Sequence, residues 1–329
     1  MTGLAAVDFA TSVAELNDIR FSEPQRIRKL LLARKRRPVV PADGRLMIVA
    51  CDHPARGALA AAGRPDAMAS RVDLLARLQT ALSRPGVDGL LATADIAEDL
   101  LLLGALEDKV VFASLNRGGL AGSVFELDDR MTGYDVRGTI EACFDGAKML
   151  ARIDLADPAT VATLDACGRA VSELNRAELV ALVEPFLSRR VDGRVVNDLT
   201  PEAVVKSVHI AQGLGASSAY TWLKLPVVAQ MERVMEATTL PTLLLGGDPD
   251  GAPDETYAQW RAALALPSVR GLVVGRSLLY PADDDVAAAV DTAAGLVRQA
   301  GHAAAPQRPA AEPPTDTHGP TGSPDQEES

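Results

Sequence analysis

The sequence has few aromatic residues and few cysteines. Aromatic side chains make up 4% of the 329 residues although 47% are hydrophobic, so a large core has to be built from Ala, Val and Leu. The cysteines, Cys51, Cys143 and Cys167, are too few and too widely spaced for a disulfide framework or a structural zinc site. These absences exclude a small disulfide-stabilised secreted scaffold, and we expect a cytoplasmic protein.

Long hydrophobic runs and an excess of positive charge are also missing. No run reaches the roughly 18 apolar residues of a membrane span, and no charged-then-apolar leader precedes a small-residue cleavage site. The formal net charge is −11, whereas binding to a nucleic-acid backbone needs a basic surface. The sequence therefore predicts neither a membrane nor a nucleic-acid partner.

Lysine is the scarcest charged residue. The chain has 33 Lys and Arg residues in total, but its only lysines are Lys29, Lys35, Lys109, Lys148, Lys206 and Lys224. Arginine takes the place of lysine nearly everywhere else. A lysine within an apolar strand pattern therefore needs a reason of its own.

Short apolar runs alternate with helical patterns along most of the chain. Such continuous runs are typical of buried parallel strands. The competing doubly wound sheet usually has a glycine-rich turn after its first strand, where this chain has Cys51-Asp52-His53-Pro54. We therefore predict a (β/α)₈ TIM barrel with strands at Leu46–Cys51, Gly89–Ala92, Val110–Leu115, Ala147–Ile153, Leu179–Val183, Ala219–Leu225, Thr242–Leu245 and Gly271–Val274.

Two extensions flank this barrel domain, which we place at residues 41–302. Residues 1–40 form an N-terminal extension, in which Ser22 is the expected N-cap of a basic helix that runs to about Arg36 with a solvated face. Residues 303–329 are rich in Pro, Ala, Thr, Gly and acidic residues and have too little apolar content to order themselves. We predict that this tail is disordered.

Four ionisable residues lie in or just after predicted strands. Active sites of (β/α)₈ barrels form at the carboxyl ends of the strands. An unpaired charge buried there would cost several kcal/mol. A mutually compensated cluster with a catalytic function explains these residues best: Asp52, Lys148, Glu184 and Lys224.

Lys224 is the predicted nucleophile. Strand alternation places Tyr220, Trp222 and Lys224 on one face, which points into the barrel. Desolvation and a nearby cation such as Lys148 favour the unprotonated amine that attacks a carbonyl. An alternative is a structural lysine that extends to solvent or pairs with Glu184.

Glycines follow the last two predicted strands. Gly246 and Gly247 come after the seventh, and Gly275 with Arg276 comes after the eighth. Barrels commonly bind phosphate at these two positions, where backbone N–H groups and a guanidinium can hold its oxygens. Each glycine pair taken alone is also compatible with an ordinary loop.

Two further residues are substrate-binding candidates near the first strand. His53 and Arg56 follow Asp52, although a histidine at a strand end is as often a local hydrogen-bonding residue. No group of His, Cys and carboxylate side chains has metal-ligand spacing, and no Ser or Cys has the spacing of a nucleophile elbow or triad. The sequence predicts no metal and no cofactor.

With these residues placed, the segment from Leu46 to Tyr280 resembles the class I aldolases. The superfamily includes tagatose-bisphosphate, archaeal-type fructose-bisphosphate and deoxyribose-phosphate aldolases. The resemblance is carried by Ala50-Cys51-Asp52-His53, Trp222-Leu223-Lys224-Leu225-Pro226, Gly246-Gly247 and Val274-Gly275-Arg276-Ser277. It implies that Lys224 forms a Schiff base and that Gly246, Gly247, Gly275 and Arg276 bind phosphate.

The residues also resemble particular branches of this superfamily. Asp52, Lys148 and Glu184 on strands one, four and five look most like the tagatose-bisphosphate branch, and the absence of a lysine on strand seven puts deoxyribose phosphate in doubt. The segment 52–57 also resembles actinobacterial aldolase-like proteins associated with inositol catabolism. That resemblance suggests 2-deoxy-5-keto-gluconate 6-phosphate as substrate, with a ketose bisphosphate next.

The residues predict a reversible aldol cleavage. Lys224 attacks a ketone, Glu184 exchanges protons, Asp52 holds hydroxyl groups, and Lys148 keeps the amine neutral and orients oxygen atoms. Alternatives are a phosphosugar isomerase or lyase without an imine, and a non-catalytic barrel that binds a sugar phosphate. We expect a phosphorylated small molecule as the ligand and a homo-oligomeric assembly.

Overall fold

The fold was obtained as a computed structural model, which describes residues 9–247 and 253–304, with side chains as far as Gly301. The first two residues of the predicted tail, 303 and 304, end the last helix, and the remainder of the tail lies outside the described residues. None of the described helices is both long enough and apolar enough to cross a membrane.

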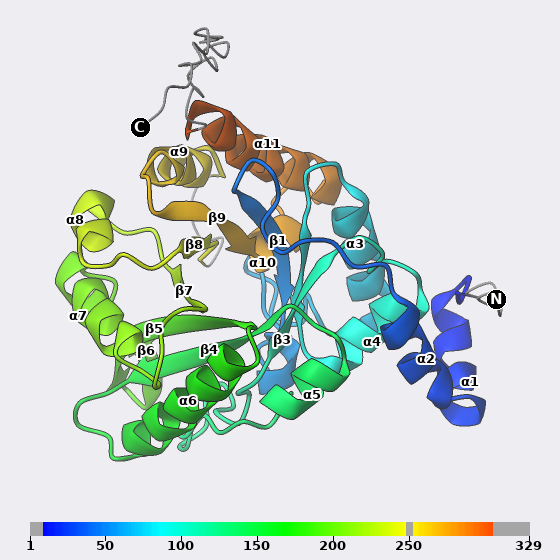
Figure 1. Cartoon of the computed structure of the whole chain (residues 1–329), viewed down its shortest axis with the longest axis horizontal. Helices are drawn as coiled ribbons and strands as arrows, with labels where there is room; N and C mark the ends of the chain where they lie inside the picture. The colour runs from blue at the N-terminus through cyan, green and yellow to red at the C-terminus, as the bar shows by residue number, and fades with distance from the viewer. Residues whose placement is uncertain (1–8, 248–252, 305–329) are drawn as a thin grey trace, which may run out of the picture.

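Eight parallel strands close into a barrel, which confirms the predicted (β/α)₈ fold (Figure 1). Around the ring the strands follow the order β1, β2, β3, β4, β5, β7, β8, β9, and β9 pairs with β1. Their bounds agree with the predicted ones to within a few residues, except at the end of β5. They are β1 (Leu46–Cys51), β2 (Gly89–Ala92), β3 (Val110–Ser114), β4 (Gly146–Ile153), β5 (Val180–Val191), β7 (Thr221–Leu225), β8 (Thr242–Leu245) and β9 (Val269–Val274).

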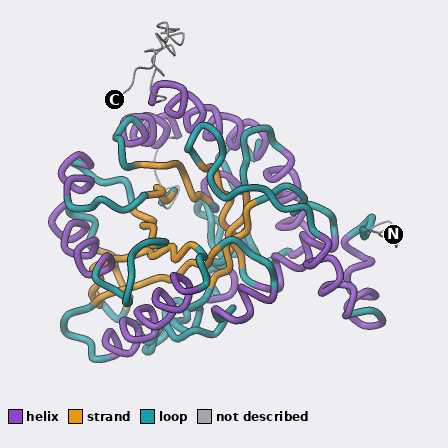
Figure 2. Tube along the Cα trace, in the orientation of Figure 1, coloured by secondary structure: helices purple, strands orange, loops and turns teal. Residues whose placement is uncertain are grey.

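Helices surround the strands (Figure 2). Helix α7 (Pro201–Gln212) shows how such a helix begins: Pro201 occupies its first position, and the Thr200 side chain accepts a hydrogen bond from the backbone N–H of Ala203. The helices after β1 are η1 (Pro54–Arg56), α3 (Arg71–Ser83), α4 (Ala94–Leu102), α5 (Val136–Glu141), α6 (Ala159–Arg176), α7 (Pro201–Gln212), α8 (Met231–Glu236), α9 (Pro253–Leu264), α10 (Arg276–Leu279) and α11 (Val286–Ala304).

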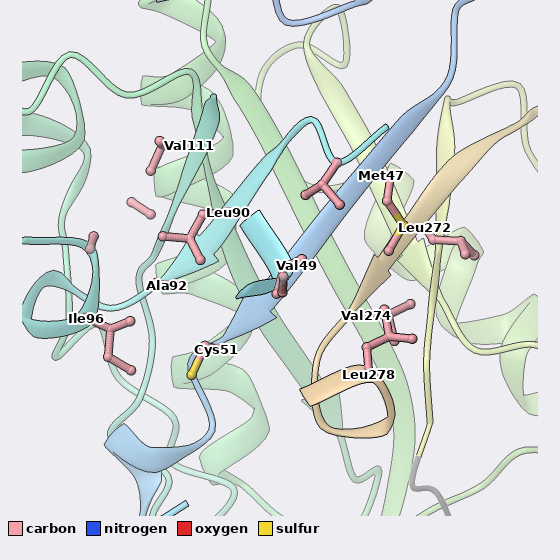
Figure 3. Packing of buried hydrophobic residues seen from close by; sticks show 14 of the residues in the cluster. Met47, Val49, Cys51, Leu90, Ala92, Ile96, Val111, Leu272, Val274 and Leu278 are labelled. Atoms are coloured by element: carbon pink, nitrogen blue, oxygen red, sulfur yellow. The ribbon is translucent and has the colours of Figure 1, made fainter. Parts of the chain in front are cut away.

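Side chains of each strand alternate between two apolar cores. In β1, Met47, Val49 and Cys51 point outward and pack with residues of the neighbouring strands and helices (Figure 3). Leu46 and Ile48 point inward and pack inside the barrel with residues such as Phe112 and Leu182. Both faces of the strands are therefore buried, which is the reason for their continuous apolar sequences.

The fifth strand is longer than the sequence indicates. It was expected to end at Val183, but β5 continues to Val191 and turns back into β6 (Arg194–Asn197), which pairs with it antiparallel. In the hairpin the exposed and partly buried residues alternate, and Glu184 and Pro185 interrupt the apolar pattern before it. A prediction based on continuous apolar runs therefore ends this strand before its actual end.

The N-terminal helices differ from the prediction. Ser22 is not an N-cap: it is the last residue of α1 (Val13–Ser22), and its hydroxyl donates to the carbonyl oxygen of Asp18 at 2.6 Å. This bond back to the preceding turn keeps Ser22 within the helix. The basic helix α2 (Gln25–Ala33) begins after Pro24 and packs beside α4.

The basic segment is also less solvated than predicted. The Arg34 side chain is buried, donates hydrogen bonds to the carbonyl oxygens of Lys109 (2.6 Å) and Cys143 (3.1 Å), and lies 3.9 Å from Asp145 Oδ2. Arg36 pairs with Asp145 Oδ1 at 3.0 Å. Lys109 and Asp145 immediately precede β3 and β4, so the segment covers the amino-terminal end of the barrel.

Replacing Arg34 with Met should destabilise the fold. The substitution removes the guanidinium donor from the partly buried carbonyl groups of Lys109 and Cys143, which costs about 1–3 kcal/mol. Urea denaturation should show this loss in the free energy of unfolding. The matched variant Arg28→Met, on the exposed face of α2, should change it by less than about 0.5 kcal/mol. Equal effects of the two substitutions would contradict the buried role of Arg34.

Candidate active site

A cavity of about 610 Å³ lies at the carboxyl ends of the strands. The four predicted catalytic residues and the six predicted binding residues all line it, although they come from six different strands or the loops after them. They are Asp52, His53, Arg56, Lys148, Glu184, Lys224, Gly246, Gly247, Gly275 and Arg276. The structure therefore brings every residue predicted from the sequence to one site.

The cavity floor is a chain of buried ion pairs. Glu184 accepts from two lysines: Lys224 Nζ lies 2.9 Å from its Oε1, and Lys148 Nζ lies 2.8 Å from its Oε2. Lys148 Nζ also lies 2.9 Å from Asp52 Oδ2. Alternation within β4, β5 and β7 points these side chains inward, just above the apolar layer formed by residues such as Leu182.

Asp52 has two more partners. Arg117 Nη1 lies 3.3 Å from its Oδ2, and the hydroxyl of Ser114 donates to the same oxygen at 2.8 Å. Burial would raise the pKa of Asp52, but Arg117 and then Lys148 hold it well below its usual range. Asp52 is therefore ionised and fixed in position.

The pKa values of Glu184 and Lys148 are shifted as well. Burial opposes ionisation of Glu184, yet the ammonium groups of Lys148 and Lys224 lower its pKa to about 2. Burial and the positive charge of Arg117 lower the pKa of Lys148, while Asp52 and Glu184 oppose this shift. At neutral pH, Glu184 is thus in the form that accepts a proton.

His53 is close to Asp52 without a hydrogen bond to it. Its Nδ1 lies 3.7 Å from Asp52 Oδ1 and has no hydrogen-bond partner among the described residues. Burial lowers the pKa of His53 to about 3, and the positive charges of Arg276 and Lys224 contribute further. The neutral imidazole has a nitrogen available to a substrate hydroxyl group, and its role in substrate binding stays a prediction.

Two of the glycines are required by close packing. A Cβ at Gly275 would lie 2.3 Å from the carbonyl oxygen of Ala50, and a Cβ at Gly246 would lie 2.5 Å from Val274 Cγ1. Gly247, by contrast, has a φ of 67°, which favours glycine for conformational reasons. Only glycine lets the loops after β8 and β9 approach each other and β1 this closely.

Sequence reasoning missed a group of polar residues around β3 and β4. Arg117 follows β3, Arg152 lies near the end of β4, and both are buried and line the cavity with Glu126. The alternation that places Lys148 inward also places Arg152 inward, so that arginine was detectable. Glu126 was not, because it lies in the long loop between β3 and α5.

Within residues 9–247 and 253–304, no group of three or more His, Cys, Asp and Glu side chains is arranged to hold a metal ion. The carboxylates of Asp52 and Glu184, which line the cavity, instead form ion pairs with lysine and arginine.

Comparison with known proteins places the chain in a family. The family model described as Cgl0159-like matches residues 44–294. The chain belongs to the Cgl0159-like family. The crystal structure of Cgl0159 from Corynebacterium glutamicum is 55% identical, with a TM-score of 0.86, and the match covers 88% of this chain and 98% of that one. No curated protein matches the chain.

The fold of this Cgl0159-like protein is also similar to that of Schiff-base aldolases. An archaeal fructose 1,6-bisphosphate aldolase is 18% identical, with a TM-score of 0.56 over 83% of this chain and 99% of that one. A second structure, of the Schiff-base-forming fructose-1,6-bisphosphate aldolase, is 19% identical over 82% and 99%, also at 0.56. These similarities confirm the resemblance to the class I aldolases at the level of the barrel fold.

The neutral state of His53 predicts a pH dependence of stability. Its folded pKa of about 3 lies below the ordinary value of 6.5, so the unfolded chain binds a proton more readily. Stability is therefore lost as the pH falls from about 6.5 towards 3. His53→Asn should reduce the slope of the unfolding free energy between pH 6.5 and 5, by at most about 1.4 kcal/mol per pH unit. Denaturant titrations at several pH values measure this slope, and an unchanged slope would contradict a neutral, partly buried imidazole.

Proposed function

We propose that this protein is a class I aldolase that cleaves a phosphorylated keto sugar or keto acid through a Schiff base on Lys224. The observation that carries this proposal is the contact of one buried carboxylate, Glu184, with two buried lysines in a cavity at the carboxyl ends of the strands. Buried charges are costly, and such a cluster at a barrel mouth is typical of a catalytic site. The class I aldolase-like fold supports the same reaction type.

The order of the strands supports a substrate position with the phosphate at the glycine loops and the ketone near Lys224. In the ring, β7 with Lys224 is next to β8, and β9 follows. A phosphate bound by Gly246, Gly247, Gly275 and Arg276 would therefore lie beside the amine. In the proposed complex the ketone is adjacent to this phosphate, and the rest of the substrate extends across the cavity towards Lys148 and Asp52.

The first chemical stage is formation of the imine. Once Glu184 has taken a proton from the Lys224 ammonium, the resulting amine attacks the ketone carbon. Glu184, which contacts both lysines, passes this proton and then a second one, lost by the nitrogen after the attack, to the ketone oxygen. The carbon–oxygen bond breaks, and water leaves an iminium ion. The nearby ammonium of Lys148 orients the substrate oxygens.

The second stage is cleavage of the carbon–carbon bond. Glu184 removes the proton of the hydroxyl group on the carbon that becomes the aldehyde, and the electron pair of the broken bond moves to the iminium nitrogen. The resulting enamine is then protonated on carbon, and hydrolysis releases the ketone product and the free lysine. Asp52, fixed by Ser114 and Arg117, holds a substrate hydroxyl group during this transfer.

Borohydride trapping should label Lys224. Incubation with a ketose phosphate and borohydride reduces the iminium to a stable secondary amine, and peptide mass spectrometry locates the adduct. Lys224→Met should lose both labelling and turnover, whereas Lys206→Met, on the exposed face of α7, should retain both. Turnover should also persist in the presence of a chelator, because the iminium serves as the electron sink.

Two outcomes would change this proposal. Labelling at Lys148, whose pKa is lowered by burial and by Arg117, would exchange the roles of the two lysines. Turnover of a substrate without any labelling would favour a phosphosugar isomerase or lyase that acts by acid–base chemistry alone. Binding of a sugar phosphate without turnover would favour a non-catalytic barrel.

We propose 2-deoxy-5-keto-gluconate 6-phosphate as the substrate, with dihydroxyacetone phosphate and malonate semialdehyde as products. Its ketone adjoins the phosphate-bearing carbon, as the neighbouring positions of Lys224 and the glycine loops require. A coupled assay for triose phosphate should detect its cleavage. Efficient cleavage of fructose or tagatose bisphosphate, with none of the keto acid phosphate, would refute this choice.

A further inference from the structure

Arg117 has a donor that the protein does not use. The residue is 4% exposed and lines the cavity, and its Nη1 is held by the side chain and carbonyl oxygen of Asp52. Its Nε donates to the carbonyl oxygen of Asn116 at 2.5 Å, but its Nη2 has no hydrogen-bond partner among the described residues. A buried guanidinium nitrogen without an acceptor is costly unless a ligand supplies one.

Two other arginines lie close to Arg117 and share a single acceptor. Arg56 Nη2 and Arg152 Nη1 each lie 2.6 Å from the same oxygen, Glu126 Oε1. The Nε atoms of Arg56 and Arg152 are buried and have no hydrogen-bond partner in the described part of the chain. Burial, with the positive charges of Arg152 and Arg117, lowers the pKa of Arg56 to about 10. Asp129 Oδ2 lies 3.7 Å from Arg152 Nη2, while Glu126 is shared by two arginines and Asp52 is shared by Arg117 and Lys148. The three guanidinium groups are thus crowded together, and each keeps one buried nitrogen without an acceptor among the described residues.

The whole cavity has an excess of cationic side chains, in contrast to the chain as a whole. Its lining contains the acidic residues Asp52, Glu126, Glu184 and Glu255 and the basic residues Arg56, Arg117, Lys148, Arg152, Lys224 and Arg276. The complete chain has a formal net charge of −11. This local excess favours a ligand with more than one negative charge.

The three arginines lie far around the ring from the glycine loops. Arg117 and Arg152 come from the ends of β3 and β4, which are opposite β8 and β9 in the eight-strand order. The loop that carries Arg56 reaches the same side, because the carbonyl oxygen of Arg56 accepts a hydrogen bond from the backbone N–H of Ala121 at 2.9 Å. The ion-paired lysines lie between the two regions.

We infer that Arg56, Arg117 and Arg152 form a second anion-binding subsite, which recognises a carboxylate or phosphate group at the end of the substrate remote from the ketone. This inference rests on the proposed function, because it places the first phosphate at Gly246 and Gly275. Guanidinium groups pair with either anion through parallel N–H···O bonds. The substrate class is therefore a phosphorylated keto compound with an anionic group at both ends.

Ligands without a ketone test the subsite independently of imine chemistry. Gluconate 6-phosphate carries a carboxylate and a phosphate, glucitol 6-phosphate carries the phosphate alone, and glucitol 1,6-bisphosphate carries two phosphates. Isothermal titration of the full chain should give at least about tenfold tighter binding of one doubly anionic ligand than of glucitol 6-phosphate, as expected for a charge-assisted hydrogen bond. Preference for gluconate 6-phosphate identifies the second anion as a carboxylate, and preference for the bisphosphate identifies it as a phosphate.

Substitutions of the arginines test whether these residues cause the preference for doubly anionic ligands. Arg117→Met should abolish the preference and change the affinity for glucitol 6-phosphate by no more than about twofold. Arg56→Met should have the same effect and serves as a second test if Arg117→Met does not fold. The matched control is Arg130→Met in the same loop, because the Arg130 side chain is 73% exposed and its ion pair within the described residues is with Asp128. It should retain the full preference.

Three results would overturn the inference. These are equal affinities of the wild-type protein for all three ligands, the absence of binding by any of them, and an equal loss of affinity for every ligand in Arg117→Met. The proposed function fails separately, in the borohydride experiment. A protein that prefers doubly anionic ligands but forms no imine would keep the subsite and lose the aldolase mechanism.

Discussion

The site depends on the sharing of Glu184 between Lys148 and Lys224. Each of these side chains is buried, and an isolated charge at the same position would cost several kcal/mol. Because Glu184 contacts both lysines and Lys148 also contacts Asp52, no member is left without an opposite charge. Removal of any one of them would leave its neighbours uncompensated, so the four residues act as a unit.

The barrel separates this charged layer from the parts that stabilise the fold. Below it, the inward side chains form an apolar layer that includes Ile48, Phe112 and Leu182. At the amino-terminal end, Arg34 and neighbouring arginines bind carbonyl groups and the aspartates before β2 and β4. Stability is thereby concentrated at one end of the strands, and the opposite end is free to hold reactive groups.

In the function that we propose, the charged layer and the arginine group together determine which ligands the cavity favours. The glycine loops after β8 and β9 allow close approach of an anion near Lys224, and the arginines at the ends of β3 and β4 provide positive charge across the cavity. A substrate that spans both regions would have its reactive carbon above the lysines. Binding energy at its two ends would then hold the carbonyl near the amine.

The sequence by itself determined the barrel, because buried parallel strands need continuous apolar runs, and it determined which strand residues face inward, because alternation is a local property. It also located Lys224, Glu184, Lys148 and Asp52 as charges that interrupt those runs. Only the tertiary structure decided the contacts of Arg117 with Asp52 and of Arg152 with Glu126, and the burial of Arg34. These contacts join loops and strands that are distant in the sequence, and periodicity within one segment carries no information about a partner in another.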